Sequence, residues 1–384
     1  MNKKPYEVIV IGSGATGGVA AQTFAENGVR VLVIEAGPEL TPQEAMGSEP
    51  INSFNRLKGI ITGQHKIQSQ HPGYWKSNPL LYANEIENPY EYPQGKPFLW
   101  TQGQQVGGRS LTWGGITLRL SDGEFKGNEI DHFGPSWPIR HKDLSIHYTS
   151  LEKAFKVHGH KDNLEQLPDG EYIEELPFTN SEINFAESVK KSLGYPVIHS
   201  RGFGPKSSKA SNKWPLSSSP GSSLKNAIGT GNIEIISDHI VERFTLDRER
   251  KSSNGIIIVN KRNGARHKLD ANLIVICAST IQTNKILLNS EEKTQDNGFI
   301  DPSNLLGHYL MDHISICRFF SLSNKIKKEN NSVSTEKNIL SGAGSLFIPL
   351  GNKYNSKSET NFIRGYGIWG GINRFGLPNW INKI

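Results

Sequence analysis

The chain has 384 residues, of which 35% are hydrophobic and 21% are charged, so it is long enough for more than one domain and has the composition of a soluble globular protein. No apolar run approaches the ~20 residues of a membrane-spanning helix. The net charge of +6 comes from scattered basic residues without a nucleic-acid recognition motif. These features predict neither a membrane span nor a nucleic-acid partner.

The N-terminus does not have the form of a signal peptide. Lys3 and Lys4 precede an apolar run, Val8 to Ile11, that is far too short for a signal-peptide core. A cytoplasmic location is therefore expected, and a periplasmic one only if the chain is exported together with a partner that carries the signal.

A β-α-β unit is predicted at the start of the chain. Its glycine turn, Gly12-Ser13-Gly14-Ala15-Thr16-Gly17, fits the pattern G-x-G-x-x-G, and Glu35 follows Gly17 by 18 residues. In such units the helix N-terminus attracts a pyrophosphate and the acidic residue accepts hydrogen bonds from ribose hydroxyls. The motif predicts dinucleotide binding and leaves FAD and NAD both open. The unit consists of a strand at 6–11, a turn at 12–18, a helix at 19–27 capped by Gly28, and a strand at 29–34.

Further elements follow along the chain. Residues 46–95 show few periodic segments and are expected to form a long surface excursion, whereas 142–157 has helical spacing. The stretch 207–223, rich in Ser, Lys and Pro, is expected to be a mobile loop. From residue 233 the apolar pattern predicts a strand at 233–236 and a meander at 240–247, 255–260 and 267–269. A fully apolar run at 273–278 predicts a buried parallel strand, and a helix is expected at 280–289. Two more strands are expected at 344–349 and 362–370.

A second glycine-rich segment favours FAD over NAD. The run Gly103 to Gly115, which contains Val106-Gly107-Gly108-Arg109-Ser110-Leu111-Thr112-Trp113, resembles the flavin-contacting signature of the glucose–methanol–choline (GMC) oxidoreductases. The closest likeness is to their bacterial, pyranose-oxidase-like branch. Further matches occur in family order through nearly the whole chain. They are Trp137-Pro138-Ile139 with Asp143-Leu144 and Tyr148, Ala278 to Thr283 with Ile286 to Ser290, and Gly307-His308 with Met311-Asp312-His313.

The resemblance implies the cofactor site. Ser110, Thr112 and Trp113 would lie along the flavin, Val241 would contact adenine through its backbone, and Ala278 and Ser279 would lie beside the pyrophosphate. Thr112 occupies the position of the histidine that some relatives link covalently to FAD, so non-covalent FAD is expected. The full set of expected cofactor residues is Gly12, Ser13, Gly14, Thr16, Gly17, Glu35, Gly107, Gly108, Ser110, Thr112, Trp113, Val241 and Ala278.

The resemblance also implies the fold class, which is α/β. A Rossmann-like FAD-binding domain with a mainly parallel sheet and a β-meander would be interleaved with an incomplete α+β substrate domain. The FAD domain is expected to gather residues 1–45, 96–120 and 232–310. The segments 46–95, 121–231 and 311–384 would form the substrate side.

Other candidate sites are weaker. His308, Asp312 and His313 suggest a metal site, because His308 and Asp312 are spaced to share one face of a helix. No further ligand follows at a clear spacing, so no metal site is predicted. His158 and His160 are expected to be exposed loop residues. The serines at 217–219 lack the G-x-S-x-G pattern of a hydrolase nucleophile. Cys277 and Cys317 do not form a metal or redox motif.

No catalytic residue is assigned in this chain. In GMC oxidoreductases a histidine of the C-terminal segment takes the hydroxyl proton of an alcohol or sugar substrate, whereas the last histidine here is His313. The resemblance therefore implies a truncated or split form that needs a complementing C-terminal polypeptide. Two alternatives remain: an inactive flavin-binding remnant or partner-dependent subunit, and an NAD-dependent Rossmann enzyme, which the second glycine segment disfavours.

Overall fold

The computed structural model describes residues 6–132, 134, 136–173, 178–203, 213–247, 252–294, 298–318, 346–350 and 365–372. The chain forms two compact units. Unit 1 comprises Met1–Trp113 and Ser207–Ile316, and unit 2 comprises Gly114–Lys206 and Cys317–Ile384.

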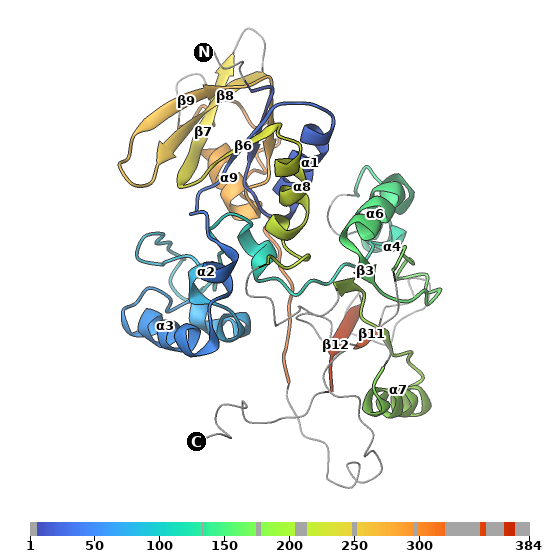
Figure 1. Ribbon diagram of the computed structural model, residues 1–384. Coiled ribbons are helices and arrows are strands. Elements are labelled where there is room, and N and C mark those ends of the chain that lie inside the picture. Colours follow the sequence, from blue (N-terminus) through green and yellow to red (C-terminus); the bar gives the residue numbers. More distant parts are fainter. Residues whose placement is uncertain are drawn as a thin grey trace. The chain divides into compact units, whose positions relative to one another are not determined.

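Unit 1 is built on a Rossmann-like parallel sheet (Figure 1). Its strands are β1 (Val8–Ile11), β2 (Val31–Ile34), β6 (Ile233–Ile236) and β10 (Leu273–Ile276), in the order β10-β1-β2-β6. All three pairings are parallel and place the last residues of the four strands level with one another. The residues that follow these strands therefore meet at one edge of the sheet.

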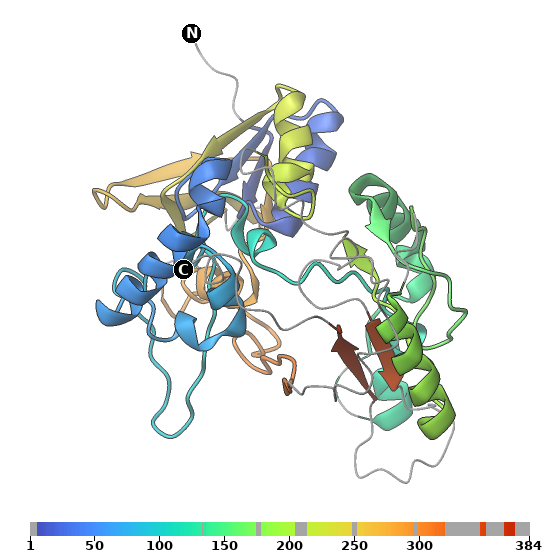
Figure 2. The same cartoon turned by 60° about the horizontal axis from the view of Figure 1, so that its bottom comes forward.

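Strands β1 and β2 are apolar throughout because their side chains point alternately to the two faces of the sheet and both faces are covered. Val8, Val10, Val31 and Val33 face helices α1 (Ala15–Glu26) and α8 (Ser223–Gly229), and the isoleucines and leucine between them face the other side. On that side they pack against the antiparallel sheet and α9 (Thr280–Leu288). Figures 1 and 2 show the two helices on one side of the parallel sheet and the antiparallel sheet on the other.

The antiparallel sheet is the expected meander. It runs through β7 (His239–Asp247), β8 (Ser252–Asn260) and β9 (Arg266–Asp270) in sequential order. Its inward side chains, among them Val241 and Ile256, complete the core below β1 and β2. The fold class predicted from the sequence is confirmed: the protein is α/β, with a parallel Rossmann-like sheet and antiparallel sheets.

The stretch 46–95 contains more helix than the sequence analysis expected. Helix α2 (Pro42–Met46) is followed by a 13-residue helix, α3 (Glu49–Ile61), and three short 3₁₀ turns. The buried positions of α3 carry Asn52, Arg56 and Gly59 rather than apolar residues, so the usual apolar period of a core-facing helix is absent from the buried side. The turns are η1 (Gln68–Gln70), η2 (Pro72–Lys76) and η3 (Pro79–Leu81).

The serine-rich stretch also differs from its prediction where the structure describes it, at 213–223. It was expected to be a mobile loop, yet Ser218, Ser219 and Ser223 are almost fully buried. The reason is close packing: a Cβ added at Gly18 of α1 would lie 2.1 Å from the Ser219 Oγ and 2.5 Å from the Ser223 Oγ. Residues 207–212 lie outside the described residues.

Unit 2 contains helices and short antiparallel strands. The predicted helix at 142–157 is confirmed as α6 (His141–Phe155), and the strands expected at 344–349 and 362–370 correspond to β11 (Leu346–Leu350) and β12 (Tyr366–Gly370). The elements of unit 2 are α4 (Asp122–Phe125), α5 (Gly127–Asp131), α6, β3 (Val157–His158), α7 (Asn180–Leu193), β4 (Ile198–His199), β5 (Gly202–Phe203), β11 (Leu346–Leu350) and β12 (Tyr366–Gly370).

The two units divide the chain differently from the expected domains. Residues 46–95 and 213–231 belong to unit 1, because Tyr74 and Leu81 share a core cluster with Leu111, and Ala227 packs with α1. Residues 114–120 belong to unit 2. The division into a flavin side and a substrate side stays a prediction.

No helix among the described residues is long and apolar enough to cross a membrane.

Candidate dinucleotide site

The candidate site lies in unit 1, at the edge where the four parallel strands end. The register pairs Ile11 with Ile34 and Ile276, and Ile34 with Ile236. The next residues along the chain, Gly12, Glu35 and Cys277, therefore follow neighbouring strands at one level. Ligands of open parallel sheets bind outside the carboxyl ends of the strands.

The three motif glycines serve different purposes. Gly12 has a φ of +96°, and a Cβ there would lie 2.5 Å from the Cys277 carbonyl oxygen, so only glycine fits between β1 and β10. A Cβ at Gly17 would lie 1.9 Å from the Gly12 carbonyl oxygen, which shows how closely α1 packs on the turn. A Cβ at Gly14 would meet nothing within 4 Å. The Gly14 position therefore faces open space, on the side from which a ligand can approach the backbone.

Helix α1 presents an uncapped N-terminus at this place. Its N-cap residue is Gly14, which has no side chain to cap the helix, and the first turn contains no acidic residue. The first N–H groups of an α-helix have no carbonyl partner within the helix, and the helix dipole makes this end positive. A pyrophosphate supplies the acceptor oxygens and the negative charge that such an end attracts.

Glu35 is a buried carboxylate held by hydrogen-bond donors of the turn. Its Oε2 accepts hydrogen bonds from the Ser13 backbone N–H at 3.1 Å and from the Ser13 hydroxyl at 2.6 Å, and its Oε1 accepts one from the Gly37 N–H at 3.0 Å. Burial raises the pKa of the Glu35 carboxyl above its ordinary value, and these hydrogen bonds oppose the rise. The bonds fix the carboxylate at the end of β2, where ribose hydroxyls are recognised in dinucleotide sites.

The second glycine segment lies against the first, as the sequence analysis expected. The Gly107 N–H donates a hydrogen bond to the Ser13 hydroxyl at 3.0 Å, and a Cβ at Gly108 would lie 3.5 Å from the Gly14 Cα. Gly107 has a φ of +96° and caps the short 3₁₀ turn η4 (Gly108–Leu111). The two glycine segments thus form one cradle of backbone, with Gly14 on its open side.

Ser110 holds this cradle together from inside. It is buried, its hydroxyl donates to the Gly107 carbonyl oxygen at 2.6 Å, and the same hydroxyl accepts a hydrogen bond from the Ser219 N–H at 2.8 Å. The Trp113 indole N–H donates to the Ser217 carbonyl oxygen at 2.9 Å. Ser217 and Ser219 therefore support the cradle, a role that the sequence analysis missed because serine-rich stretches resemble loops.

The remaining predicted residues are placed as follows. The Ala278 Cα would lie 3.3 Å from a Cβ added at Gly12, so the residues that follow β10 touch the turn. The Val241 side chain is buried in the core, which leaves only its backbone for a ligand. Thr16 is exposed at the start of α1 and hydrogen-bonds to the Cys277 thiol. The Thr112 hydroxyl donates weakly, at 3.4 Å, to the Arg109 carbonyl oxygen. The contact of each with a cofactor stays a prediction.

The candidate metal residues are not arranged as ligands in the described part of the chain. His308 and Asp312 lie in a stretch without helical structure, so their spacing does not place them on a helix face. Among the described residues, no group of three or more His, Cys, Asp or Glu side chains could hold a metal ion. His160 is exposed in unit 2, with its Nδ1 3.1 Å from an oxygen of Asp162.

A substitution at Glu35 tests its place in the cradle. We expect Glu35→Ala to weaken FAD binding by roughly 1.5–3 kcal/mol, the contribution of a hydrogen bond to a charged group. Isothermal titration of the apoprotein measures the change. Glu39→Ala, which removes an exposed carboxylate four residues away, is the matched control. Equal affinity of wild type and Glu35→Ala would remove Glu35 from the site.

The same carboxyl predicts a pH dependence of stability. Because the folded-state pKa is raised, the folded apoprotein keeps this proton at pH values where the unfolded chain has lost it. The contribution of Glu35 to stability is therefore present below its ordinary pKa and falls as the pH rises through the raised value. The unfolding free energy of wild type minus that of Glu35→Ala should therefore decrease as the pH is raised across a series of measurements.

Comparison with known proteins agrees with the cradle. The family described as GMC oxidoreductase matches residues 6–315. The chain is 27% identical to 2-methyl-1,2-propanediol dehydrogenase of Mycolicibacterium austroafricanum over 80% of its own length and 55% of that protein. It is 23% identical to the fructose dehydrogenase large subunit of Gluconobacter japonicus, over 85% of its length and 62% of that protein.

A partial similarity to a solved structure was also found. Pyridoxine 4-oxidase from Mesorbium loti superposes with a TM-score of 0.47 at 18% identity, covering 74% of this chain and 51% of that one. The chain spans about half to three fifths of the length of the curated relatives it matches. Since the family match extends over most of the chain, this protein belongs to the GMC oxidoreductases.

Proposed function

We propose that this chain is the FAD-binding part of an oxidoreductase that acts on the CH–OH group of an alcohol or sugar. The observation that carries the proposal is the cradle: two glycine segments 94 residues apart joined at Ser13, an uncapped helix start, and a buried carboxylate at the end of β2. When bound there, FAD would supply the acceptor for the hydride that leaves the substrate carbon.

Each part of the cradle fits a different part of FAD. The N–H groups at the start of α1 would hold the pyrophosphate, and Glu35 would accept hydrogen bonds from ribose hydroxyls. The backbone of Val241 is proposed for adenine, and the η4 segment with Thr112 and Trp113 for the flavin ring. Threonine cannot form the covalent link that a histidine forms, so the flavin is proposed to be non-covalent.

The substrate class rests on the relatives. One is named as a dehydrogenase of a diol and another as a dehydrogenase of fructose, both of which carry CH–OH groups. We infer an alcohol or sugar substrate for this chain. The acid–base group is proposed to lie outside the 384 residues of this sequence, because they contain no histidine after His313.

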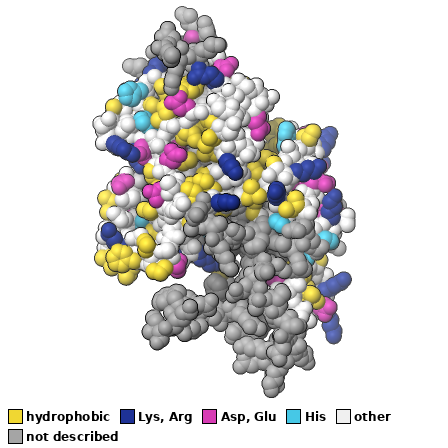
Figure 3. Space-filling view, in the orientation of Figure 1, with side chains coloured by type: hydrophobic (Ala, Val, Ile, Leu, Met, Phe, Trp, Pro, Cys, Tyr) yellow, Lys and Arg dark blue, Asp and Glu magenta, His cyan; other side chains and the backbone are white. Residues whose placement is uncertain are grey.

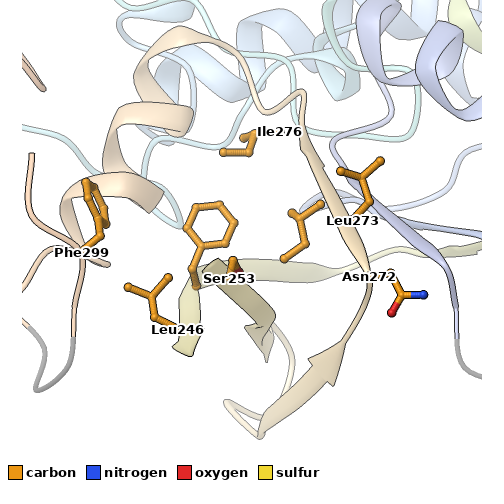
Figure 4. Close-up of a pocket in the computed structure, with 8 residues that line it drawn as sticks. Leu246, Ser253, Asn272, Leu273, Ile276 and Phe299 are labelled. Carbon is orange, nitrogen blue, oxygen red and sulfur yellow. The ribbon is translucent and has the colours of Figure 1, made fainter. Parts of the chain in front are cut away.

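One surface of unit 1 suits additional polypeptide beyond the described residues. Strand β10 is an edge of the parallel sheet among the described residues, and Leu273 on it is 46% exposed. Beside this strand lies a mostly apolar pocket of about 320 Å³, lined by residues that include Phe244, Leu246 and Phe299 (Figure 4). A free edge with an adjacent apolar hollow can accept a further strand and its side chains.

The purified chain tests the cofactor part of this proposal. We expect a yellow protein, or one that becomes yellow with added FAD, and release of the flavin into solution by acid precipitation. A protein that takes up no flavin while its circular dichroism shows the α/β fold would refute the proposed cofactor. Flavin that stays with the acid precipitate would refute the non-covalent mode only.

We expect no useful turnover from the flavin-loaded 384-residue chain alone. Loss of a positioned acid–base group lowers a rate by about 10²–10⁴-fold. Dye-coupled assays with aldoses, glycosides and primary alcohols measure this, with free FAD as the control. Robust turnover that disappears in His308→Ala or His313→Ala would contradict the expectation and show a complete active site in this chain. Absent turnover with intact flavin binding also fits the alternative, a flavin-binding protein without catalysis.

A further inference from the structure

A ribose bound at the end of β2 needs hydrogen-bond donors as well as the acceptors of Glu35. Each ribose hydroxyl can donate one hydrogen bond and accept others, whereas an ionised carboxylate only accepts. The polar hydrogens beside Glu35 are already in use, because the Ser13 N–H, the Ser13 hydroxyl and the Gly37 N–H all donate to its carboxylate. The hydroxyl oxygens of the ribose therefore need donors from other residues.

Two basic side chains near the end of β2 are engaged elsewhere. The Arg262 guanidinium donates to the Asp238 carboxylate at 2.6 and 3.1 Å. Both ring nitrogens of His239 make hydrogen bonds, Nδ1 with the Ser237 carbonyl oxygen at 2.7 Å and Nε2 with the Asn260 amide at 3.2 Å. These contacts commit both side chains to the turn that joins β6 to β7.

Lys261 and Gln104 form a pair that keeps donors in reserve. Lys261 lies in the turn between β8 and β9 (Figure 1), and its Nζ donates to the Gln104 Oε1 at 3.3 Å. An ammonium group has three donors, and Gln104 is the only acceptor of this one among the residues that the structure describes. Because an ammonium cannot accept a hydrogen bond, the amide oxygen of Gln104 must face Lys261, which leaves the amide NH₂ group for another partner.

Two separate routes place this pair at the end of β2. A Cβ added at Gly37 would lie 1.9 Å from the Gln104 carbonyl oxygen, so Gln104 packs directly on the residue whose N–H holds Glu35. On the other route, the Lys261 N–H donates to the Asp238 carbonyl oxygen at 2.9 Å, and the Asp238 N–H donates to the Gly37 carbonyl oxygen at 3.0 Å. The backbone of Lys261 is thus tied to the end of β2, and its side chain returns to the same place through Gln104.

We propose that Lys261 and Gln104 form the donor half of a ribose site of which Glu35 is the acceptor half. The Lys261 ammonium and the Gln104 amide would donate to hydroxyl oxygens on the ribose of the adenosine part of FAD, while Glu35 accepts the hydroxyl protons. A charged donor makes the stronger hydrogen bond, so the larger effect belongs to Lys261. This inference rests on the proposed function, since it names residues that complete the FAD site.

The contribution of Lys261 is expected to be local. On the face shown in Figure 3, basic and acidic side chains are interspersed, without a large area of one sign. The charge of a lysine elsewhere in the meander should therefore add little to FAD binding. Lys268 on β9 is such a lysine, because its Nζ lies 2.9 Å from an Asp270 carboxylate oxygen and its side chain is 47% exposed. Lys268→Met thus removes the same charge from the same sheet and serves as the matched control.

Isothermal titration of the apoprotein with FAD tests the inference. We expect Lys261→Met to raise the dissociation constant by about 10- to 100-fold, the range for loss of a hydrogen bond from a charged donor, and Lys268→Met to leave it unchanged. Lys261→Arg, which keeps a charged donor, should restore most of the affinity. Urea unfolding should give wild type and Lys261→Met apoproteins of equal stability, because the site is empty in both.

Analogues of FAD that lack one ribose hydroxyl separate a ribose contact from any other role of Lys261. With the 2′-deoxyadenosine and 3′-deoxyadenosine analogues, the difference in affinity between wild type and Lys261→Met should become small for at least one of the two. An undiminished difference with both analogues would overturn the inference, as would an equal loss of affinity in Lys268→Met. Equal FAD affinity of wild type and Lys261→Met would overturn it and leave the proposed function standing, whereas a wild-type chain that binds no FAD would overturn both.

Discussion

Purified Gly14→Val protein is expected to fold and to bind FAD at least about a hundredfold more weakly than wild type. Gly14 has a φ of −65°, which valine adopts readily, and a Cβ there meets nothing within 4 Å, so the apoprotein should tolerate the change. The new side chain would fill the open side of the cradle. Blocking two or more charge-assisted hydrogen bonds of about 1.5 kcal/mol each accounts for an effect of this size.

Titration of flavin fluorescence measures the affinity, and urea unfolding of the apoprotein measures the stability. Gly14→Ala, with a single methyl group, should lie between wild type and Gly14→Val. The key result is the separation of the two quantities: affinity should fall while the free energy of unfolding stays near that of wild type. If Gly14→Val binds FAD as tightly as wild type, the cradle is not the pyrophosphate site.

Gly17→Ala is expected to do the reverse, by destabilising unit 1 itself. The added Cβ would lie 1.9 Å from the Gly12 carbonyl oxygen, and this atom belongs to the backbone, so no side chain can move aside. The helix would have to shift away from β1, which would disturb its contacts with Val8, Val10 and Ala227. Overpacking of this kind costs up to about 3 kcal/mol and occasionally more, and we expect a value at the upper end.

Comparison of Gly14→Ala with Gly17→Ala provides the sharpest test of the geometry, because both changes add one methyl group to the same turn. Urea unfolding of the two apoproteins, followed by circular dichroism, should show a clear loss of stability for Gly17→Ala only. Equal stability of the two variants would show that the turn packs on α1 less closely than described.

The sequence sufficed for the parallel sheet and the first glycine turn because their signals are local. Val8 to Ile11 is an apolar run without alternation, which is typical of a strand covered on both sides, and all four residues are buried. The strand at Leu273–Ile276 was also expected to be buried, but it lies at the edge of the sheet among the described residues, with Leu273 exposed and the other three residues half-buried. The contact between Gly107 and Ser13 came from the family resemblance, since nothing in the local pattern of either segment specifies a partner 94 residues away.

Two features could not be predicted from the sequence, the support that Ser219 gives to the cradle and helix α3, and each has a physical reason. Ser219 supports the cradle through its backbone N–H, and any residue type could supply that donor, so the sequence carries no mark of it. Helix α3 was missed because its inward positions, Asn52 and Arg56, are satisfied by carbonyl oxygens and by Glu49 instead of by apolar neighbours. A pattern search for core-facing helices looks for the opposite arrangement.

The hydrogen bonds of the cradle also bear on how unit 1 folds. Gly107 reaches Ser13 across 94 residues and Ser219 reaches Ser110 across 109, so the cradle can close only after three distant stretches of chain have come together. Contacts of such long sequence separation form slowly, because loop-closure entropy is lost before they stabilise the fold. Flavin uptake during refolding should therefore lag behind the formation of secondary structure. The yellow colour of a preparation would then report the fraction of molecules in which the whole of unit 1, and not merely its first β-α-β unit, has reached the native state.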